Sequence, residues 1–440
     1  MREADMVKQK EYYFYPEKLI LFRNIACDPL IKKAKELLEL IHLEPDNYLK
    51  RDNSFYHICT ELVKMAEYYH WTGNLWQHFL ALLIIQAENT FTRISAWSRG
   101  EKIDPGMMIL AAHDMKYLKQ IWDSDFRTLG DWVPLEIINT LEDFTNTFTY
   151  PGKIRNPQYK SVDVLQRCLR EINDPTQMAA CLTDFYQKVG YGKVGLFSSF
   201  HWQEEEGLVG IPYPDQIKLK NLIGYEHQKR TIINNTKAFV SGKKANNMLL
   251  YGERGTGKSS TIKALVNEYY TQGLRLLEVT KAQFANLSVI IRNLREYPQR
   301  FLIFIDDLSF ESNETEYKQL KYILEGGMEI LPDNVVIYAT SNRRHLVQES
   351  WHDREGGGEV RIHDSVSEKL SLADRFGITV TYTSPDQEEY LKIVVGLAEQ
   401  NGLDIPLNEL REKALQWERW HNGRSGRTAK QFINSLSSHF

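Results

Sequence analysis

Two patterns of apolar residues divide this chain. Over roughly the first 200 residues, apolar side chains recur every three or four positions, the spacing typical of amphipathic helices. The predicted helices cover Leu30–Leu43, Phe55–Trp71, Leu75–Trp97, Met107–Trp122, Val162–Ile172 and Met178–Val189. Prolines separate several of them. We therefore expect an all-helical N-terminal domain over residues 1–202, in which the many tryptophans and tyrosines serve as core side chains rather than as a base-stacking platform.

The second pattern begins near residue 221, where short apolar runs alternate with longer helix-compatible segments. The runs expected to form strands are Met248–Tyr251, Leu274–Val279, Phe301–Ile305, Val335–Thr340 and Ile378–Tyr382. The sequence between consecutive runs is long enough for a crossover helix, so an α/β fold with a parallel, three-layer, five-stranded sheet is predicted over residues 221–384. Residues 203–220, with three glutamates and two prolines, resemble a linker, and residues 385–440 are predicted to form a small helical lid.

A phosphate-binding loop lies between the first predicted strand and the next helix. Residues 252–259 satisfy the pattern G-x-x-x-x-G-K-[ST]. Its glycines let backbone N–H groups close round phosphates, with Lys258 at the β- and γ-phosphates and Ser259 at magnesium. The residues expected to bind nucleotide here are Gly252, Glu253, Arg254, Gly255, Thr256, Gly257, Lys258, Ser259 and Ser260. The alternative is a glycine-rich turn before a structural helix.

Polar residues follow two further apolar runs. The run Phe301–Ile305 stops at Asp306 and Asp307, and the run Val335–Thr340 leads to Asn342. Nucleotide hydrolysis requires one carboxylate for the metal and one for the attacking water. We assign Asp306 to magnesium and Asp307 to the water, and place Asn342 within reach of the γ-phosphate or the water. The alternative is that the two aspartates merely begin a turn.

The order of these motifs resembles that of the AAA+ ATPases. The loop, Asp306–Asp307, Ala339–Asn342, Ser371–Gly377 and Gly423–Thr428 are similar to Walker A, Walker B, sensor 1, the arginine-finger box and sensor 2. Leu222–Glu226, the Gly-Glu-Arg-Gly form of the loop, Asp306–Glu311 and Ser341–Leu346 more closely resemble a family of bacterial AAA+-type ATP-binding proteins catalogued as a domain of unknown function. This likeness covers roughly residues 185–440.

The resemblance implies a role for several further residues. Ile223, Gly224 and Tyr225 are expected to line the adenine pocket, Asn342 to act as sensor 1, Arg375 to reach a neighbouring subunit's site and Arg427 to reach the γ-phosphate from the lid. Most AAA+ proteins carry glutamate where Asp307 stands, so Glu311 is an alternative water-polarising group if the chain turns helical after Leu308. Arg343 or Arg344 is an alternative finger, with Arg375 then a surface charge, and Arg427 has the alternative of a solvated helix face.

Composition adds mostly exclusions. With 54 basic and 58 acidic residues among 440, the net charge is −4, which gives no overall electrostatic footprint for nucleic acid. Four widely spaced cysteines predict buried free thiols in a reducing compartment. The N-terminus has no apolar signal core, and the longest apolar stretch, Phe79–Ile85, is too short to span a bilayer. We therefore expect a cytoplasmic protein without a membrane partner.

A second glycine pattern lies at the end of the helical half. Residues 190–195 match G-x-G-x-x-G, the dinucleotide fingerprint. That fingerprint follows a strand, whereas this segment follows a predicted helix. We therefore favour a hinge or a glycine-rich docking turn over a dinucleotide site.

Two functions of different classes follow from the sequence. In the first, the protein is an oligomeric Mg-ATP-dependent ATPase that remodels or loads a protein or nucleic-acid partner, with the helical domain as adaptor. In the second, it is a nucleotide-gated switch or scaffold that hydrolyses ATP slowly and uses the helical domain as a binding surface. A small-molecule P-loop kinase is disfavoured, because such kinases do not require the finger and lid arginines in this order.

Overall fold

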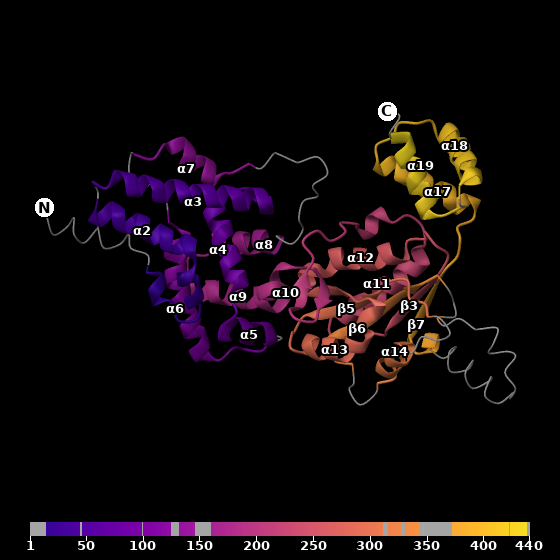
Figure 1. The fold of residues 1–440 in the computed structure, drawn as a ribbon, viewed down its shortest axis with the longest axis horizontal. Helices are drawn as coiled ribbons and strands as arrows, with labels where there is room; N and C mark the ends of the chain where they lie inside the picture. Colours follow the sequence, from indigo (N-terminus) through magenta and orange to yellow (C-terminus); the bar gives the residue numbers. More distant parts are fainter. Residues whose placement is uncertain are drawn as a thin grey trace. The chain divides into compact units, whose positions relative to one another are not determined.

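The structure, a computed structural model, describes residues 15–44, 46–98, 100–124, 132–145, 160–310, 316–326, 331–342, 346, 372–421 and 423–437 (Figure 1). The chain forms two compact units, the first made of residues 1–197 and 212–214 and the second of residues 198–211 and 215–440. Glu311, Arg343 and Arg344 lie outside the described residues. So does the glycine run 356–358, for which the sequence predicts a flexible loop.

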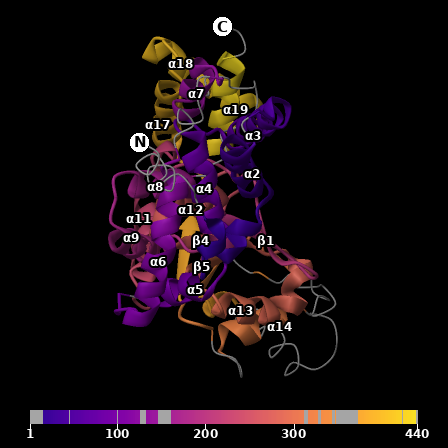
Figure 2. The ribbon, with the colours of Figure 1, turned by 90° about the vertical axis from the view of Figure 1, so that its left-hand side faces the viewer.

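Every regular element described in the first unit is a helix. These are η1 (Pro16–Lys18), η2 (Arg23–Cys27), α2 (Pro29–Leu43), α3 (Tyr48–Tyr69), α4 (Leu75–Gln86), α5 (Thr90–Trp97), α6 (Pro105–Trp122), α7 (Leu135–Glu142), α8 (Lys160–Arg170), α9 (Pro175–Lys188) and α10 (Gly192–Leu196). Nine of the twelve residues of α4 are buried. This helix packs against α3, α6, α7, α8 and α10, and Figure 2 shows the helical unit from the side. None of the helices that the structure describes is long and apolar enough to cross a membrane.

One predicted helix is in fact two. The segment Leu75–Trp97 was predicted as continuous, but α4 ends at Gln86 and α5 begins at Thr90. Asn89 caps the new helix, because its side chain accepts the Thr92 N–H while the Thr92 hydroxyl accepts the Asn89 N–H. This reciprocal capping box satisfies backbone N–H groups that have no partner at the start of a helix, so α5 begins here as a separate helix.

The glycine pattern at residues 190–195 forms a packing turn at α10. Gly192 has a φ of 58°, and a Cβ atom on Gly195 would lie 2.8 Å from the Gly190 carbonyl oxygen and 2.9 Å from Ile85. The segment follows helix α9, so it lacks the strand that a dinucleotide fingerprint requires. The glycines serve close packing, as a docking turn requires.

Asp114 holds the first segment of the helical unit. Its fully buried carboxylate accepts the backbone N–H groups of Ile20, Leu21 and Phe22 at 2.8 to 3.1 Å. Three converging donors compensate the loss of hydration that a buried carboxylate suffers. α6 therefore anchors the chain between η1 and η2 through a single side chain.

The second unit is built on a seven-stranded sheet in the order β2-β1-β4-β5-β6-β3-β7. The strands are β1 (Ser199–Gln203), β2 (Gly207–Gly210), β3 (Met248–Gly252), β4 (Leu274–Glu278), β5 (Arg300–Ile305), β6 (Val335–Ser341) and β7 (Ile378–Tyr382). All neighbouring pairs are parallel except the β1–β2 hairpin. The five predicted strands are present, but the count of five was wrong, because the hairpin that extends the sheet was assigned to the N-terminal domain and a linker.

Helices cover both faces of this sheet, which gives the predicted three layers. They include α11 (Glu226–Val240), α12 (Lys258–Tyr269), α13 (Leu287–Arg295) and α14 (Glu316–Leu324), with η5 (Leu219–Asn221), η6 (Tyr270–Gln272) and η7 (Lys281–Asn286) as short turns. Figure 1 shows α11 and α12 on one face and α13 and α14 on the other. β3, β4, β5 and β6, in the middle of the sheet, bury nearly all their side chains, so they lack the alternation of a half-exposed strand. The edge strand β7 does alternate, with Thr379 and Thr381 exposed.

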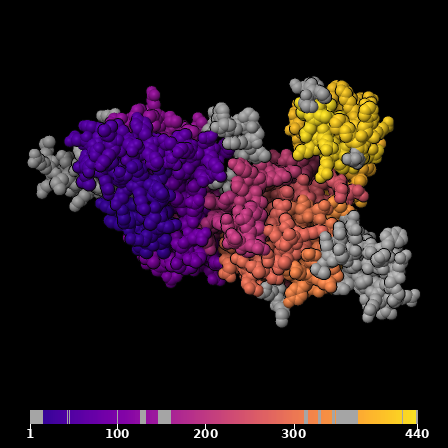
Figure 3. Space-filling view, viewed as in Figure 1, coloured from indigo at the N-terminus to yellow at the C-terminus, as the bar shows by residue number. Residues whose placement is uncertain are grey.

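The lid consists of α17 (Gln387–Gln400), α18 (Leu407–Trp420) and α19 (Gly426–Ser437), drawn in yellow in Figure 3. These helices have their own apolar core, which includes Tyr390, Val394, Leu410 and Phe432. Ile223, from the segment before α11, packs against that core. The lid thus has a core of its own and contacts the segment before α11 through Ile223.

Candidate functional site: a phosphate-binding loop between sheet and lid

The phosphate-binding loop joins β3 to α12 and depends on its glycines. Gly252, Gly255 and Gly257 have φ angles of 137°, 76° and 92°, in the left-handed region that favours glycine. A Cβ atom on Gly252 would lie 1.8 Å from the carbonyl oxygen of Tyr382 in β7. Glycine is therefore required by the backbone at these positions of the sequence pattern.

Lys258 is the buried cation of the loop, with 6% of its surface exposed. Its ammonium donates to the carbonyl oxygens of Gly252 and Glu253, at 2.8 and 2.7 Å, and to Oδ1 of Asn342 at 3.3 Å. Burial lowers the pKa of Lys258, while Asp307, Glu253 and Asp306 act in the opposite direction. An anionic ligand would restore some of the stabilisation that the ammonium loses on leaving water.

Asp306 collects three donors at the end of β5. Its Oδ1 accepts the hydroxyls of Ser259 and Thr340, each at 2.6 Å, and the backbone N–H of Asp307 at 3.1 Å. A hydroxyl and a carboxylate at this distance are hard oxygen ligands of the kind that Mg²⁺ takes together with phosphate and water. No group of three or more His, Cys, Asp or Glu side chains that could hold a metal occurs among the described residues.

Asp307 has an unusual backbone conformation. Its φ is 49°, which places a non-glycine residue in the left-handed region, where aspartate is among the better tolerated side chains. Its N–H donates to Oγ1 of Thr340, and its Oδ1 accepts Nδ2 of Asn342 at 2.6 Å. Residues 308–310 are not helical, so the condition for the alternative based on Glu311 is not met over these residues.

The carboxamide of Asn342 links the two charges of the site. Its Oδ1 faces the Lys258 ammonium and its Nδ2 faces the Asp307 carboxylate. This assignment of the amide is the only one that satisfies both contacts. The strand end predicted to carry sensor 1 therefore lies within hydrogen-bonding distance of both the loop and the second acid.

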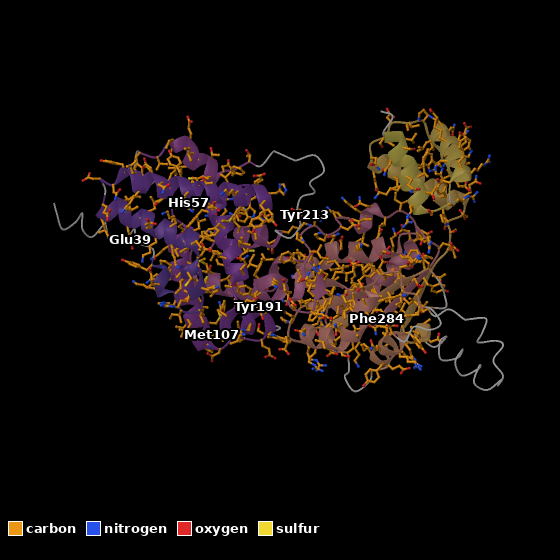
Figure 4. All side chains as sticks on the ribbon, viewed as in Figure 1. Glu39, His57, Met107, Tyr191, Tyr213 and Phe284 are labelled. Atoms are coloured by element: carbon orange, nitrogen blue, oxygen red, sulfur yellow. The ribbon has the colours of Figure 1, made fainter. Side chains whose placement is uncertain are left out.

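The turn after β5 is held by aromatic packing. Phe310 is buried, its N–H donates to the Leu346 carbonyl, and its ring lies 6.0 Å from that of Phe284 in η7, labelled in Figure 4. Leu308 is fully buried, and its N–H donates to the Thr340 carbonyl. Fixed anchors after the two aspartates keep both carboxylates at the carboxyl edge of the sheet.

The lid touches the loop directly through the start of α19. The Arg427 N–H donates to the Gly255 carbonyl at 3.0 Å, and a Cβ atom on Gly255 would approach Arg427 and Ser425 to 2.9 and 3.0 Å. Only glycine therefore fits at position 255 of the loop without displacing Arg427 or Ser425. Arg427 lies beside the predicted phosphate site.

A cavity of about 960 Å³ opens between loop, sheet ends and lid. Of the predicted site residues, those that line it are Ile223, Gly224, Tyr225, Arg254, Gly255, Thr256, Gly257, Lys258, Ser259, Ser260, Asp306, Asp307, Asn342 and Arg427. Gly252 and Glu253 do not line it but hold Lys258 through their carbonyl groups. Sequence reasoning missed Asp215, Gln400, Asn401, Lys430 and Asn434, which also line the cavity. Of these, Lys430 and Asn434 lie on the same face of α19 as Arg427, three and seven positions further along. This helical spacing could have predicted them from the sequence.

The segment Ile223–Tyr225 forms the wall opposite the phosphate loop. Gly224 and Tyr225 have φ angles of 83° and 57°, and the Tyr225 hydroxyl donates to the Thr383 carbonyl at 2.8 Å. A Cβ atom on Gly396 of α17 would lie 2.6 Å from Ile223. The wall is therefore fixed to the core at Tyr225 and to the lid at Ile223.

Arg375 lies away from this cavity. It is not among the residues that line the cavity, and its Nε forms an ion pair with Oε1 of Glu325 at 3.0 Å. The side chain is 46% exposed. Among the predicted site residues that the structure describes, Gly252, Glu253 and Arg375 do not line the cavity. Of these three, only Arg375 forms no hydrogen bond or ion pair with a described residue that does line it.

The fold and this site define a class. The chain has three features of an AAA+-type P-loop protein. The strand before the loop, β3, lies between β6 and β7 of a parallel sheet, carboxylates lie at the end of β5, and a helical lid contacts the loop. A family model described as "Protein of unknown function (DUF815)" matches residues 196–440, more than half of the chain. The chain belongs to this family.

Other similarities are more distant. The chromosomal replication initiator protein DnaA of Limosilactobacillus fermentum is 26% identical over 174 residues, which make up 38% of this chain and 36% of that protein. The chain thus spans about a third of that relative's length. Among solved structures, the Holliday junction branch migration motor RuvB of Thermotoga maritima is 17% identical, with 50% of this chain and 64% of that chain covered and a TM-score of 0.35. A structure of DnaA bound to AMPPCP and single-stranded DNA is 18% identical, with 50% and 65% covered and a TM-score of 0.33.

Proposed function

We propose that this protein binds Mg-ATP in the cavity between loop, sheet and lid and hydrolyses it within an assembly of identical subunits. The observation that carries the proposal is the convergence of Lys258, Ser259, Asp306, Asp307 and Asn342 within one hydrogen-bonded network at the ends of β3, β5 and β6. A buried lysine whose contacts are mainly carbonyl oxygens, next to exposed acids, matches what a nucleotide triphosphate with a divalent cation requires.

In this proposal the loop binds the phosphates of ATP, and the residues at the strand ends take part in hydrolysis. Lys258 moves from carbonyl oxygens to the β- and γ-phosphates, while Ser259 and Asp306 hold magnesium. When bound, that metal neutralises charge that develops on the phosphate oxygens. Asp307 accepts a proton from the attacking water, and Asn342 orients that water or the γ-phosphate.

Arginine contributions come from two elements. Arg427, at the start of α19, binds the γ-phosphate from the lid, and its backbone contact with Gly255 supports this role. Arg375 serves the site of a neighbouring subunit, since it does not line the cavity of its own chain. Ile223, Gly224 and Tyr225 enclose adenine, with Gln400 and Asn401 as further polar wall residues.

The direct contact between Asn342 and Asp307 favours a second candidate, a slowly hydrolysing switch. The proposed water-polarising acid is an aspartate in a left-handed conformation whose Oδ1 is engaged by the Asn342 amide at 2.6 Å. A carboxylate oxygen engaged by an amide has to release that contact before it can face an attacking water. The switch would bind ATP tightly, turn over slowly and use the helical unit as its regulated binding surface.

The partner is proposed to be a protein or a nucleic acid that the helical unit recruits. Pull-down with the Asp307→Asn protein loaded with Mg-ATP tests this, because a bound but unhydrolysed nucleotide holds the partner-binding state. Nuclease treatment of the captured material separates the two classes of partner. Lys258→Ala, which lacks the loop cation, is the matched control. A partner captured equally by both variants would contradict nucleotide-dependent recruitment.

Turnover per subunit as a function of protein concentration tests the two candidates. An arginine supplied in trans makes turnover per subunit rise as subunits assemble. We expect this rise for the parent protein and its loss in Arg375→Ala. An equimolar mixture of Arg375→Ala and Lys258→Ala should regain activity, because mixed assemblies contain intact shared sites. Concentration-independent, slow turnover with unchanged Arg375→Ala activity would contradict the assembly and establish the switch.

A further inference from the structure

The backbone on both sides of Arg375 is fixed. Leu372 and Phe376 are 0% and 3% exposed, and the Phe376 N–H donates to the Ala373 carbonyl. Gly377 follows, where a Cβ atom would meet the Asn246 side chain at 2.6 Å. β7 then begins at Ile378. The arginine therefore projects from a rigid corner between two buried anchors, and its aim depends on the side-chain torsions alone.

Glu325 is equally well anchored on the opposite element. It follows α14, whose Leu320 and Ile323 are 0% and 8% exposed. The Glu325 N–H continues the helical bonding to the Lys321 carbonyl, and Gly326, with a φ of 75°, ends the turn. The backbone that carries the Glu325 carboxylate is therefore fixed, as the backbone at Arg375 is.

The ion pair between the two side chains involves one nitrogen of the guanidinium. Glu325 Oε1 lies 3.0 Å from Nε of Arg375, and the two Nη groups form no hydrogen bond or ion pair with the residues that the structure describes. Because the guanidinium is planar, fixing Nε orients both Nη groups, which carry four of its five N–H donors. Those donors are the ones that pair in a bidentate manner with phosphate.

We propose that Glu325 is a positioning residue for Arg375, which it holds through Nε so that both Nη groups face a neighbouring subunit's phosphate. The inference rests on the proposed function, in which Arg375 acts in trans. An exposed ion pair contributes little to folding, so its effect is expected in catalysis rather than in stability. Holding a long side chain in its reactive conformation removes an entropy cost from each turnover.

Turnover by the assembled protein tests the proposal. Glu325→Ala should lower kcat about tenfold, a small part of the roughly 10³- to 10⁵-fold that an arginine finger contributes. The affinity for Mg-ATP should not change, because neither side chain lines the cavity. Glu325→Gln, which keeps an acceptor oxygen, should lie closer to the parent. Lys321→Ala is the control, since the Lys321 ammonium lies 4.0 Å from the same carboxylate without orienting the arginine.

A double-mutant cycle and a spectroscopic readout complete the test. In an Arg375→Ala background, Glu325→Ala should have no further effect on kcat, whereas a purely structural role would add its own loss. In the nucleotide-free protein, the Nε–H resonance of Arg375 should shift and exchange faster with water in Glu325→Ala. Parent-level or raised turnover by Glu325→Ala, in a parent whose turnover rises on assembly, would overturn the positioning role. A parent without that rise would instead overturn the proposed function.

Discussion

The two units of this chain use their polar groups in opposite ways. In the helical unit, Asp114 meets three backbone N–H groups and nothing is left for a ligand. In the sheet unit, Lys258 and Asp307 are partnered by carbonyl and amide groups that a nucleotide can replace. A polar group whose hydrogen bonds are all made within the protein stabilises the fold, whereas one whose partners a ligand can replace is available for binding. The comparison predicts that similar polar substitutions will change stability in one unit and activity in the other.

The largest effect is expected from Asp307→Asn. The amide keeps the size of the side chain but cannot accept the proton of the attacking water, so kcat should fall by roughly 10² to 10⁴. Mg-ATP should still bind, because Asp306 and Ser259 remain. Phosphate release under saturating Mg-ATP measures the loss, and calorimetry measures the retained affinity. Turnover at the parent's rate would transfer the role to another acid, with Glu311 the first to test.

Asp114→Ala should be the matching change in the helical unit. It leaves three backbone donors without their carboxylate, one of them in the buried residue Phe22, which should lower the free energy of unfolding of that unit by about 3 kcal/mol. Asp104→Ala, which removes only the partly exposed cap of Met107 in the same helix, should cost about 1 kcal/mol. Urea unfolding followed by circular dichroism measures both. Equal stabilities of the two variants would contradict the anchoring role of Asp114.

Arg427→Ala should have a smaller effect that depends on the γ-phosphate. Loss of one charge-assisted contact should weaken ATP binding about tenfold while ADP binding changes little. Arg424→Ala is the matched control, because Arg424 pairs with Glu418 in the lid. Competition titrations with ATP and ADP measure the ratio. Equal losses for both nucleotides would show that Arg427 acts through the shape of the lid instead.

The smallest effect concerns pH. Burial lowers the pKa of Lys258, so this group loses its proton at a lower pH than an exposed lysine does. Bound phosphates favour the charged form of Lys258 and so raise its pKa again. ATP affinity should therefore decline as the pH rises through the pKa of Lys258 in the nucleotide-free protein, which lies below the ordinary value of 10.5. Titrations between neutral and alkaline pH, with Lys258→Arg as the control that stays charged, measure the decline. A flat profile for the parent would contradict the assignment.

The sheet was largely predictable because buried parallel strands are continuous apolar runs. β7 was predicted at its observed bounds, and β3, β4, β5 and β6 to within one residue at either end. The β1–β2 hairpin was missed, because the acidic turn Glu204–Glu206 and the following prolines resemble a linker. Its strands are stabilised by pairing of β1 with β4, a contact that no local pattern contains.

The site was predictable where backbone geometry dictates residue type. Glycines of the loop and acids at a strand end leave a readable pattern, whereas Thr340, which orients Asp306, resembles any other strand threonine. The pairing of Glu325 with Arg375 joins residues 50 positions apart on different elements. The four cysteines were expected to be buried, but Cys27 and Cys168 are exposed and Cys59 and Cys181 half-buried, because their helices present these positions toward the surface.

The central claim is that the cavity beside Lys258 binds Mg-ATP, and calorimetric titration of the whole protein tests it most directly. We expect saturable ATP binding that strengthens when magnesium is present, through Ser259 and Asp306. Lys258→Ala should weaken it by roughly 100-fold, about 2.8 kcal/mol, because the loop loses its buried cation. Lys263→Ala, in the same helix but not among the residues that line the cavity, should bind as the parent does. No binding by the parent, or equal binding by Lys258→Ala, would contradict the account.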